Sequence, residues 1–289
     1  MELTPLAARS FATILEERTG QQLTGGRRWR LETALQPVMR AHGCSSLETL
    51  ALRAAHGAGP DTPALRVSVA EALLNHETSF FRDRAVFDAL RDQVLPHLAG
   101  LRTKARRLRI WSAGCATGQE AHSLAMLLDA QAERWEGWTI DIVGTDVSGA
   151  AIARARDGLY RQMEAQRGLA IAELLRYLAP EGDDWRLRPE IAVRTRFAVA
   201  SLLDPPPAGR FDLILCRNVL LYFNEARRRE AFARLAEALA PDGLLVLGAG
   251  ETTLGQTDAV RPDLAFRGCY THAGGAGVAP VHGVIPSAA

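Results

Sequence analysis

Lysine is nearly absent from this sequence, because Lys104 is the only lysine among 34 basic residues. The net charge is only +1, which argues against a duplex nucleic-acid binder, where a strongly basic face is expected. Cysteine is also scarce, and no two of the four cysteines have C-x-x-C spacing. We therefore expect neither a metal site nor a redox pair.

Long hydrophobic runs are missing as well, so we expect no membrane insertion. The first residues, Met-Glu-Leu-Thr-Pro, lack the basic and apolar regions of a signal peptide. A hydrophobic content of 47% is nevertheless enough for a sizeable core in one large or two smaller domains. Together these features favour a reduced, cytoplasmic enzyme.

The first part of the chain has helical periodicity only. Apolar residues recur at Phe11, Ile14 and Leu15, and again from Leu31 to Met39. Breaks are expected at Gly25-Gly26 and between Gly57 and Pro60. We predict a helical domain over residues 1–74, a second domain over residues 75–273, and a disordered tail, rich in glycine, alanine and proline, over residues 274–289.

Strands and helices alternate in the second domain, which predicts a doubly wound, mostly parallel α/β sheet. Ser148 is placed to cap a helix that ends before Gly158, and Asn224 to begin a helix that reaches Leu239. Ligands of such sheets bind at the carboxyl ends of the strands. The expected strands are Leu108–Ala113, Thr139–Val147, Arg194–Leu202, Phe211–Asn218 and Gly243–Ala249.

An insert at about residues 160–194 interrupts this alternation. It contains a helical pattern over Ile171–Leu178 and an alternating stretch, Trp185–Arg188, that indicates a half-exposed antiparallel strand. Between them we expect a short turn, Pro180–Asp184.

The most informative segment is Arg109–Glu120, where we expect a strand, a tight turn and the start of a helix. Its last ten residues read W-S-A-G-C-A-T-G-Q-E. Its glycines let bare backbone approach a ligand. Asp146, at the end of the next expected strand, could accept hydrogen bonds from a ribose diol. The turn matches neither G-x-G-x-x-G nor a Walker lysine motif, and alone it could be an ordinary strand-to-helix turn.

Three further strings accompany the turn: N-H-E-T-S-F-F-R-D from Asn75, C-R-N-V-L-L-Y-F from Cys216, and G-L-L-V-L-G-A-G-E from Gly243. In order and spacing the four segments resemble the CheR family of chemotaxis receptor methyltransferases. The resemblance implies a class I, Rossmann-like methyltransferase that uses S-adenosylmethionine and releases S-adenosylhomocysteine. It also implies methylation of glutamate side chains in the cytoplasmic helical region of chemoreceptors.

The resemblance also assigns site residues. Asp146 would hold the ribose and Tyr222 would orient the substrate carboxylate, while Arg82 would pair with a carboxylate of cofactor or substrate. A glutamate with a pKa near ~4.3 is already ionised, so no general base is required. The full set is His76, Thr78, Arg82, Glu120, Asp146, Ser201, Leu202 and Asn218, the backbone of Arg217, and Tyr222.

Each assignment has a structural alternative. Asp146 could cap the following helix, Tyr222 could be a core tyrosine, and Arg82 could be a surface partner of Asp83 or Glu77. His76 could be an adenosine contact or a structural histidine. Ser201, expected with Leu202 at the adenine edge, stands where the family usually has asparagine.

The sequence leaves open how the protein recognises its partner. Arg27, Arg28, Arg30 and Arg40 could dock an acidic receptor helix or form a solvated face. We do not expect binding of a receptor tail peptide, because the insert lacks the glycine-bearing extension of peptide-dependent relatives. A methyltransferase for small carboxylic acids and a non-catalytic cofactor-binding adaptor are the competing functions.

Overall fold

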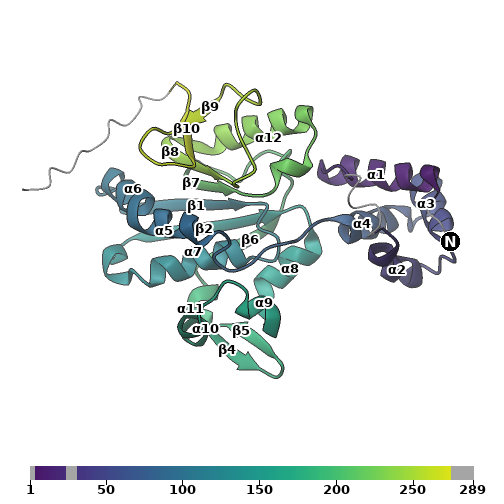
Figure 1. The fold of residues 1–289 in the computed structure, drawn as a ribbon, viewed down its shortest axis with the longest axis horizontal. Coiled ribbons are helices and arrows are strands. Elements are labelled where there is room, and N and C mark those ends of the chain that lie inside the picture. The colour runs from purple at the N-terminus through teal and green to yellow at the C-terminus, as the bar shows by residue number, and fades with distance from the viewer. Residues whose placement is uncertain (1–3, 24–30, 275–289) are drawn as a thin grey trace, which may run out of the picture.

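The computed structural model describes residues 4–23 and 31–274, which form a helical N-terminal part, an α/β body and a small antiparallel insert (Figure 1). The helical part packs around buried apolar residues such as Leu50 and, at the predicted spacing, Phe11 and Leu35. The expected break at Gly57–Pro60 separates two of its helices. Its helices are α1 (Pro5–Thr19), α2 (Leu31–Ala41), α3 (Leu47–His56) and α4 (Thr62–Leu73).

Residues 74–83 form an irregular connection into the body, and a helical stretch with a π-helical turn in its middle follows. Its segments are α5 (Arg84–Ala89), the π-helical turn η2 (Leu90–Val94) and α6 (Leu95–Leu101). Pro96 is the second residue after the π turn. Proline has no N–H to donate to the carbonyl four residues earlier, and its ring crowds that carbonyl. The widened turn relieves this clash while Phe87 and Leu98 stay buried.

The central sheet has seven strands in the order β6-β2-β1-β7-β8-β10-β9. The first five are parallel, whereas β10 is antiparallel to both β8 and β9. The prediction of a doubly wound, mostly parallel sheet is confirmed. The strands are β1 (Arg107–Ala113), β2 (Thr139–Asp146), β6 (Thr195–Val199), β7 (Phe211–Cys216), β8 (Leu239–Leu247), β9 (Val260–Pro262) and β10 (Cys269–His272).

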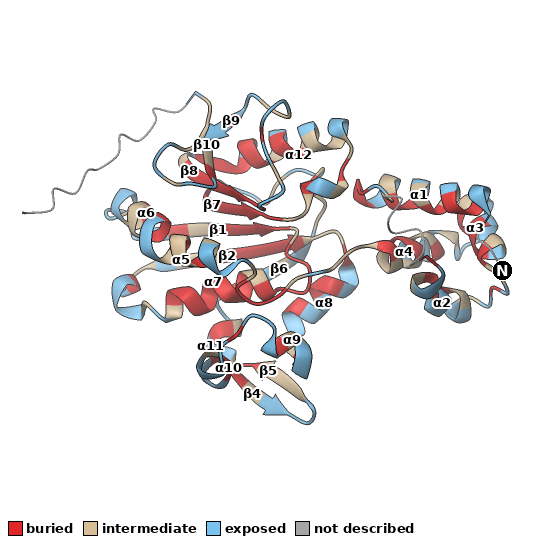
Figure 2. Cartoon of the chain, viewed as in Figure 1, coloured by how far each residue is buried: buried red, intermediate tan, exposed pale blue. Residues whose placement is uncertain are grey.

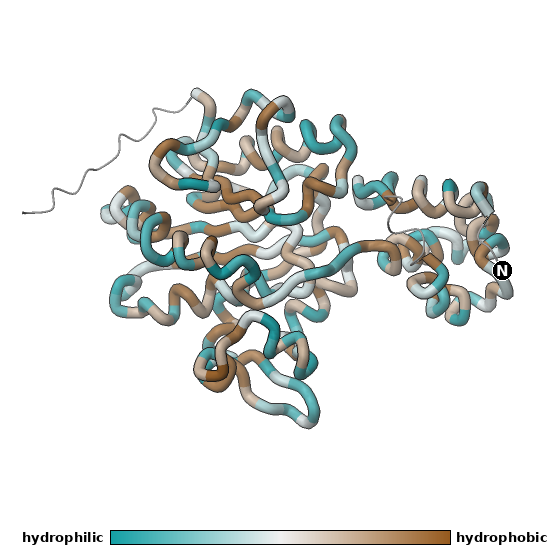
Figure 3. Tube along the Cα trace, viewed as in Figure 1, coloured by the Kyte–Doolittle hydropathy of each residue, from teal (hydrophilic) through white to brown (hydrophobic). Residues whose placement is uncertain are grey.

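Helices cover both faces of the sheet, so β7 is buried along its whole length and β1 along most of it (Figure 2). Leu213 and Leu215 of β7 face the core beneath α5, α6 and α7, while Ile214 and Cys216 face α12. Apolar residues accordingly concentrate in the strands and polar residues on the outer helix faces (Figure 3). These helices are α7 (Gln119–Asp129), the 3₁₀ turn η3 (Ala132–Trp135), α8 (Gly149–Asp157) and α12 (Glu225–Ala238).

The insert forms a separate three-stranded antiparallel sheet, as expected, in the order β3-β5-β4. The turn predicted over Pro180–Asp184 is too long, because Pro180 pairs with Trp185 and Glu181 pairs with Asp184 in the sheet. Pro180 is tolerated in β4 because β4 is an edge strand and needs fewer N–H donors. The elements are β3 (Leu159–Arg161), α9 (Gln162–Gln166), α10 (Ile171–Tyr177), β4 (Leu178–Glu181), β5 (Asp184–Leu187) and α11 (Pro189–Ala192).

The strand predicted over Arg194–Leu202 is also too long. β6 pairs with β2 from Thr195 to Val199, and its partner β2 ends at Asp146. Beyond that point a turn forms instead, because the Asp204 carboxylate accepts the N–H of Ser201 at 3.1 Å.

Some expectations fall outside the described residues: the Gly25-Gly26 break, Arg27, Arg28, Arg30 and nearly all of the tail. Within residues 4–23 and 31–274, no helix is long and apolar enough to cross a membrane.

Candidate active site

A crevice lies where the strand order reverses, between the carboxyl ends of the neighbouring strands β1 and β7. In open α/β sheets ligands bind at this position. Seven of the ten predicted site residues line it. The lining residues are Gln21, Asn75, Glu77, Thr78, Arg82, Gly114, Cys115, Ala116, Glu120, Asp146, Arg217, Asn218, Val219 and Tyr222.

The glycine turn after β1 forms one wall of the crevice. Gly114 has a φ of +77°, and a Cβ there would lie 2.5 Å from Cγ2 of Val219. Glycine is therefore required both by the left-handed backbone and by the close approach of the loop after β7.

Asp146 ties this turn to the end of β2. Its Oδ2 accepts the N–H of Ala116 at 2.9 Å, and its Oδ1 accepts the N–H of Ser148 at 2.9 Å. The cap of α8 is Ser148, whose hydroxyl accepts the N–H of Ala151 at 3.0 Å. Burial raises the pKa of the Asp146 carboxyl above its usual range, although both N–H donors oppose the shift.

Glu71 of the N-terminal part and His76 of the connecting segment lie close to Asp146. The Glu71 carboxylate of α4 contacts the Ser148 hydroxyl and accepts the N–H of Gly149 at 2.7 Å, so it docks α4 on the start of α8. His76 is near enough to favour the ionised form of Asp146. The sequence analysis missed Glu71, because nothing in a helical stretch marks which glutamate has a distant partner.

A buried ion-pair network crosses the floor of the crevice. Arg217, whose side chain is 1% exposed, donates to Glu120 at 3.1 Å and to Asp83 at 2.6 Å. It also donates to the main-chain oxygen of Arg82 at 2.9 Å. Glu120 accepts a further hydrogen bond from Ser112 at 2.8 Å. Only the backbone of Arg217 was predicted to matter, so the role of its side chain was missed.

Arg82 enters from the connecting segment together with Thr78. Its guanidinium donates to the main-chain oxygen of Glu77 at 2.7 Å. The carboxylates proposed as its alternative surface partners pair elsewhere, Asp83 with Arg217 and Glu77 with Arg167. Arg82 is therefore a positively charged residue of the crevice wall and not a member of a surface ion pair with Asp83 or Glu77.

Tyr222 lies on the 3₁₀ turn η4 (Leu220–Tyr222), which follows β7. Its hydroxyl accepts a hydrogen bond from Nδ2 of Asn75 at 2.6 Å. This contact places Tyr222 in the crevice rather than in a sealed core. Asn75, which begins the N-H-E-T-S-F-F-R-D string, was quoted but given no role, and only the fold shows its partner.

Three predicted residues are not among the lining residues. Ser201 and Leu202 follow β6, where the Ser201 hydroxyl accepts the N–H of Leu203 and Leu202 is buried in the core beneath α12. Ser201 remains close to the site, since Ala200 donates to the main-chain oxygen of Asp146 at 2.9 Å. His76 is near Asp146 but is not among the lining residues.

Comparison with known proteins agrees with this geometry. The family model described as CheR methyltransferase, SAM binding domain, matches residues 76–263. The chain belongs to the CheR methyltransferase family. It is 36% identical over 246 residues to chemotaxis protein methyltransferase 1 of Pseudomonas aeruginosa, covering 83% of this chain and 88% of the relative. It is 34% identical over 254 residues to chemotaxis protein methyltransferase Cher2 of Pseudomonas putida, covering 86% and 90%.

Unsatisfied polar groups that fit a polar cofactor lie in the CheR crevice and, in the case of His76, beside its Asp146. Gln21 Oε1, His76 Nε2 and Asn218 Oδ1 are buried and have no hydrogen-bond partner within the described part of the chain. Such groups are costly unless something pairs with them. With the carboxylates of Asp146 and Glu120, they suit the amino acid and nucleoside portions of S-adenosylmethionine, the cofactor of this family.

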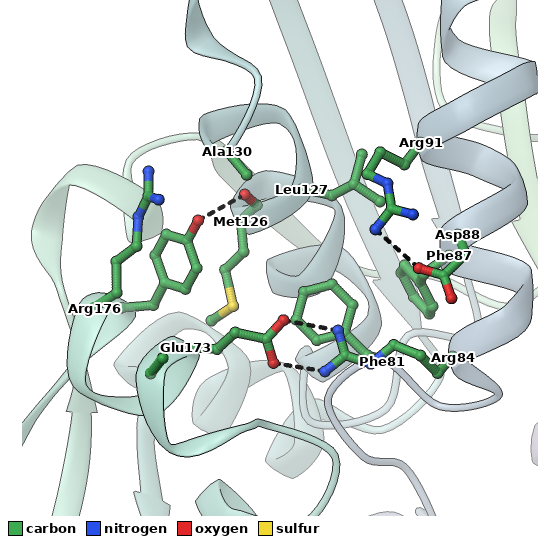
Figure 4. Close-up of a pocket in the computed structure, with 12 residues that line it drawn as sticks. Phe81, Arg84, Phe87, Asp88, Arg91, Met126, Leu127, Ala130, Glu173 and Arg176 are labelled. Carbon is green, nitrogen blue, oxygen red and sulfur yellow. Dashed lines mark hydrogen bonds and ion pairs between the residues drawn. The ribbon is translucent and has the colours of Figure 1, made fainter.

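A second cavity, of about 240 Å³, lies between α5, α7 and α10 (Figure 4). Its walls are mostly apolar, and the three arginines that line it are paired. Arg84 binds both oxygens of Glu173, at 2.7 and 2.5 Å, Arg91 pairs with Asp88 at 2.9 Å, and Arg176 pairs with Asp129 at 3.1 Å.

Proposed function

We propose that this CheR methyltransferase esterifies glutamate side chains in the cytoplasmic helical region of chemoreceptors, during sensory adaptation. The observation that carries the proposal is the convergence of Asp146, Arg82 and Tyr222 on one crevice. A cofactor-holding carboxylate, a carboxylate-binding cation and an orienting hydroxyl thus share a site. The names of the relatives, which are chemotaxis methyltransferases, support the receptor as substrate.

In this proposal the cofactor lies along the crevice with its ribose at Asp146. Glu120 and Asn218 hold polar groups of its amino acid portion, and the backbone of Arg217 forms the floor. Thr78 and His76 contribute from the connecting segment.

The chemistry needs alignment more than acid–base catalysis. When bound, S-adenosylmethionine supplies an electrophilic methyl group on a positively charged sulfur. The substrate carboxylate is ionised at neutral pH and is itself the nucleophile. Arg82 would pair with one carboxylate oxygen, and the Tyr222 hydroxyl, held by Asn75, would fix the direction of attack. The walls of the crevice would exclude water from the attacking oxygen.

The ribose assignment predicts that Asp146→Ala weakens S-adenosylmethionine binding by about 1–3 kcal/mol, the scale of a charge-assisted hydrogen bond. Calorimetry with the cofactor and with S-adenosylhomocysteine measures the change. Asp157→Ala, at the exposed far end of α8, is the matched control. Equal affinities of wild type and Asp146→Ala would rule the assignment out.

The experiment that tests the function is transfer of a labelled methyl group to membranes that contain receptors. Methyl esters release methanol in base, whereas N-methyl groups do not. We expect protein-bound, base-labile label. Base-stable label, or label only in the small-molecule fraction, would contradict the proposal.

Recognition of the receptor is proposed for residues 1–74, with residues 75–273 as the methyltransferase domain. Arg40 is exposed in the last turn of α2 and would contact an acidic receptor helix. Arg27, Arg28 and Arg30, proposed for the same contact, lie outside the described residues. This binding should weaken as salt rises.

We predict that methylation does not depend on the receptor's C-terminal residues. The β4–β5 hairpin turns through Gly182 and Asp183 alone, and the edge strand β4 contains Pro180. Because proline has no N–H, this short edge offers few main-chain bonds to an added strand. Methylation of one receptor with and without its last few residues should proceed at the same rate. A large fall on truncation, or tight binding of the free tail peptide, would show that the hairpin does hold it.

A further inference from the structure

The loop after β7 is held by a single carboxylate from a distant segment. Glu251, which follows β8, accepts the N–H of Val219 at 2.8 Å and of Leu220 at 2.7 Å through Oε1. Its Oε2 accepts the N–H of Asn218 at 2.8 Å. Successive main-chain N–H groups of this kind form an anion-binding nest, and charge-assisted bonds are the stronger kind.

The same carboxylate also fixes the loop after β8. Glu251 Oε2 accepts the N–H of Gly248 at 2.8 Å. A Cβ on Gly248 would lie 2.8 Å from Glu251 Oε2 and 2.8 Å from the nitrogen of Asn218. The two loops therefore meet around Glu251 with no space for a side chain at position 248.

On its other side, the loop after β7 touches the glycine turn. Val219 occupies the space that a Cβ on Gly114 would need. Asn218 has a φ of +59°, a conformation that needs support in a non-glycine residue. Glu251 and the glycine turn thus clamp the segment that leads into Tyr222.

We propose that Glu251 is a positioning residue for methyl transfer. Its carboxylate sets the main chain of residues 218–220, and thereby places Asn218 at the crevice floor and the Tyr222 hydroxyl beside the reacting groups. The inference rests on the proposed function, because it assigns Tyr222 to orientation of the substrate. Glu251 itself need not touch cofactor or substrate.

Glu251→Gln tests this role, because it keeps the size of the side chain but replaces one acceptor oxygen with an N–H donor. We expect kcat with receptor substrate to fall between about tenfold and about a hundredfold, since a misplacement of about 1 Å can have that effect. The cofactor affinity should fall less than kcat, because Asp146 and the glycine turn stand on β2 and β1 and only the cofactor contact of Asn218 depends on the displaced loop. Glu225→Gln, in an exposed pair with Arg229, is the matched control and should retain wild-type kcat.

A double-mutant cycle with Tyr222→Phe separates positioning from general damage. If Glu251 acts through Tyr222, Glu251→Gln should lower kcat much less in the Tyr222→Phe background than in wild type. Gly248→Ala is a second probe, because its Cβ disturbs the same contacts while the carboxylate remains. It should also lower kcat more than cofactor affinity.

An unchanged kcat in Glu251→Gln and Gly248→Ala, or fully additive effects with Tyr222→Phe, would overturn the inference. If Glu251→Gln fails to fold, the cycle is run with Gly248→Ala under the same criteria. Activity of the wild-type enzyme separates a failure of the proposed function from a failure of the role given to Glu251. Absence of base-labile transfer by wild type would contradict the proposed function, whereas normal transfer by wild type and both variants would contradict only the role of Glu251.

Discussion

Arg217→Met is expected to lower the free energy of unfolding by roughly 3 kcal/mol, at the low end for breaking a buried ion pair. Methionine fills part of the space but leaves the largely buried Glu120 carboxylate without its cation. Asp83 is half-exposed and regains water, which keeps the loss from being larger. Urea denaturation of both proteins measures the difference.

Arg229→Met is the control, because Arg229 forms an exposed pair with Glu225 on α12. Its effect should stay within about 0.5 kcal/mol, as is usual for surface substitutions. Wild-type stability in Arg217→Met would show that the network does not stabilise the floor of the crevice.

Tyr222→Phe is expected to lower kcat by about 10²-fold while cofactor affinity remains nearly unchanged, the scale of removing one hydrogen-bond donor from a reacting oxygen. The aromatic ring and the η4 turn are retained, so only the hydroxyl that contacts Asn75 is lost. Steady-state methylation of receptor membranes gives kcat, and calorimetry gives the affinity.

Tyr270→Phe makes the same chemical change in β10, outside the residues that line the crevice, and should leave kcat at the wild-type value. If Tyr222→Phe turns over as fast as wild type, its hydroxyl has no part in the reaction.

Local patterns were sufficient to predict most of the sheet. β7 and the second half of β8 are apolar runs, and β1 and β2 are largely apolar and end in small or polar residues, so these stretches are recognisable in the sequence. The start of β8 was predicted wrongly, because β8 begins at Leu239, where a helix was expected to end, and not at Gly243. Side-chain caps at Ser148 and Asn224 set the starts of α8 and α12 as predicted.

Elements that depend on distant partners were not predictable in this way. The end of β6 is set by the end of β2, and the extent of β4 by its pairing with β5. The π-helical turn η2 between α5 and α6 reflects a single proline within an otherwise ordinary helical stretch.

The residues of the site also fall into those that the sequence marks locally and those that depend on distant partners. Gly114 and Asp146 are marked by their place after a strand, so sequence reasoning finds them. Glu71 contacts Ser148, Asn75 contacts Tyr222 and Glu251 contacts Asn218, which are 77, 147 and 33 residues away, and a lone glutamate or asparagine carries no local sign of such a partner. Three-dimensional contacts were needed to identify them.

The central claim is that the crevice transfers methyl groups to glutamate carboxylates of a receptor. Tandem mass spectrometry of a receptor's cytoplasmic fragment, after incubation with enzyme and S-adenosylmethionine, tests it most directly. We expect the added methyl group on glutamate side chains, its loss after base treatment, and its strong reduction with Asp146→Ala and Tyr222→Phe. An unmodified fragment, or methyl groups on nitrogen that survive base, would contradict the account.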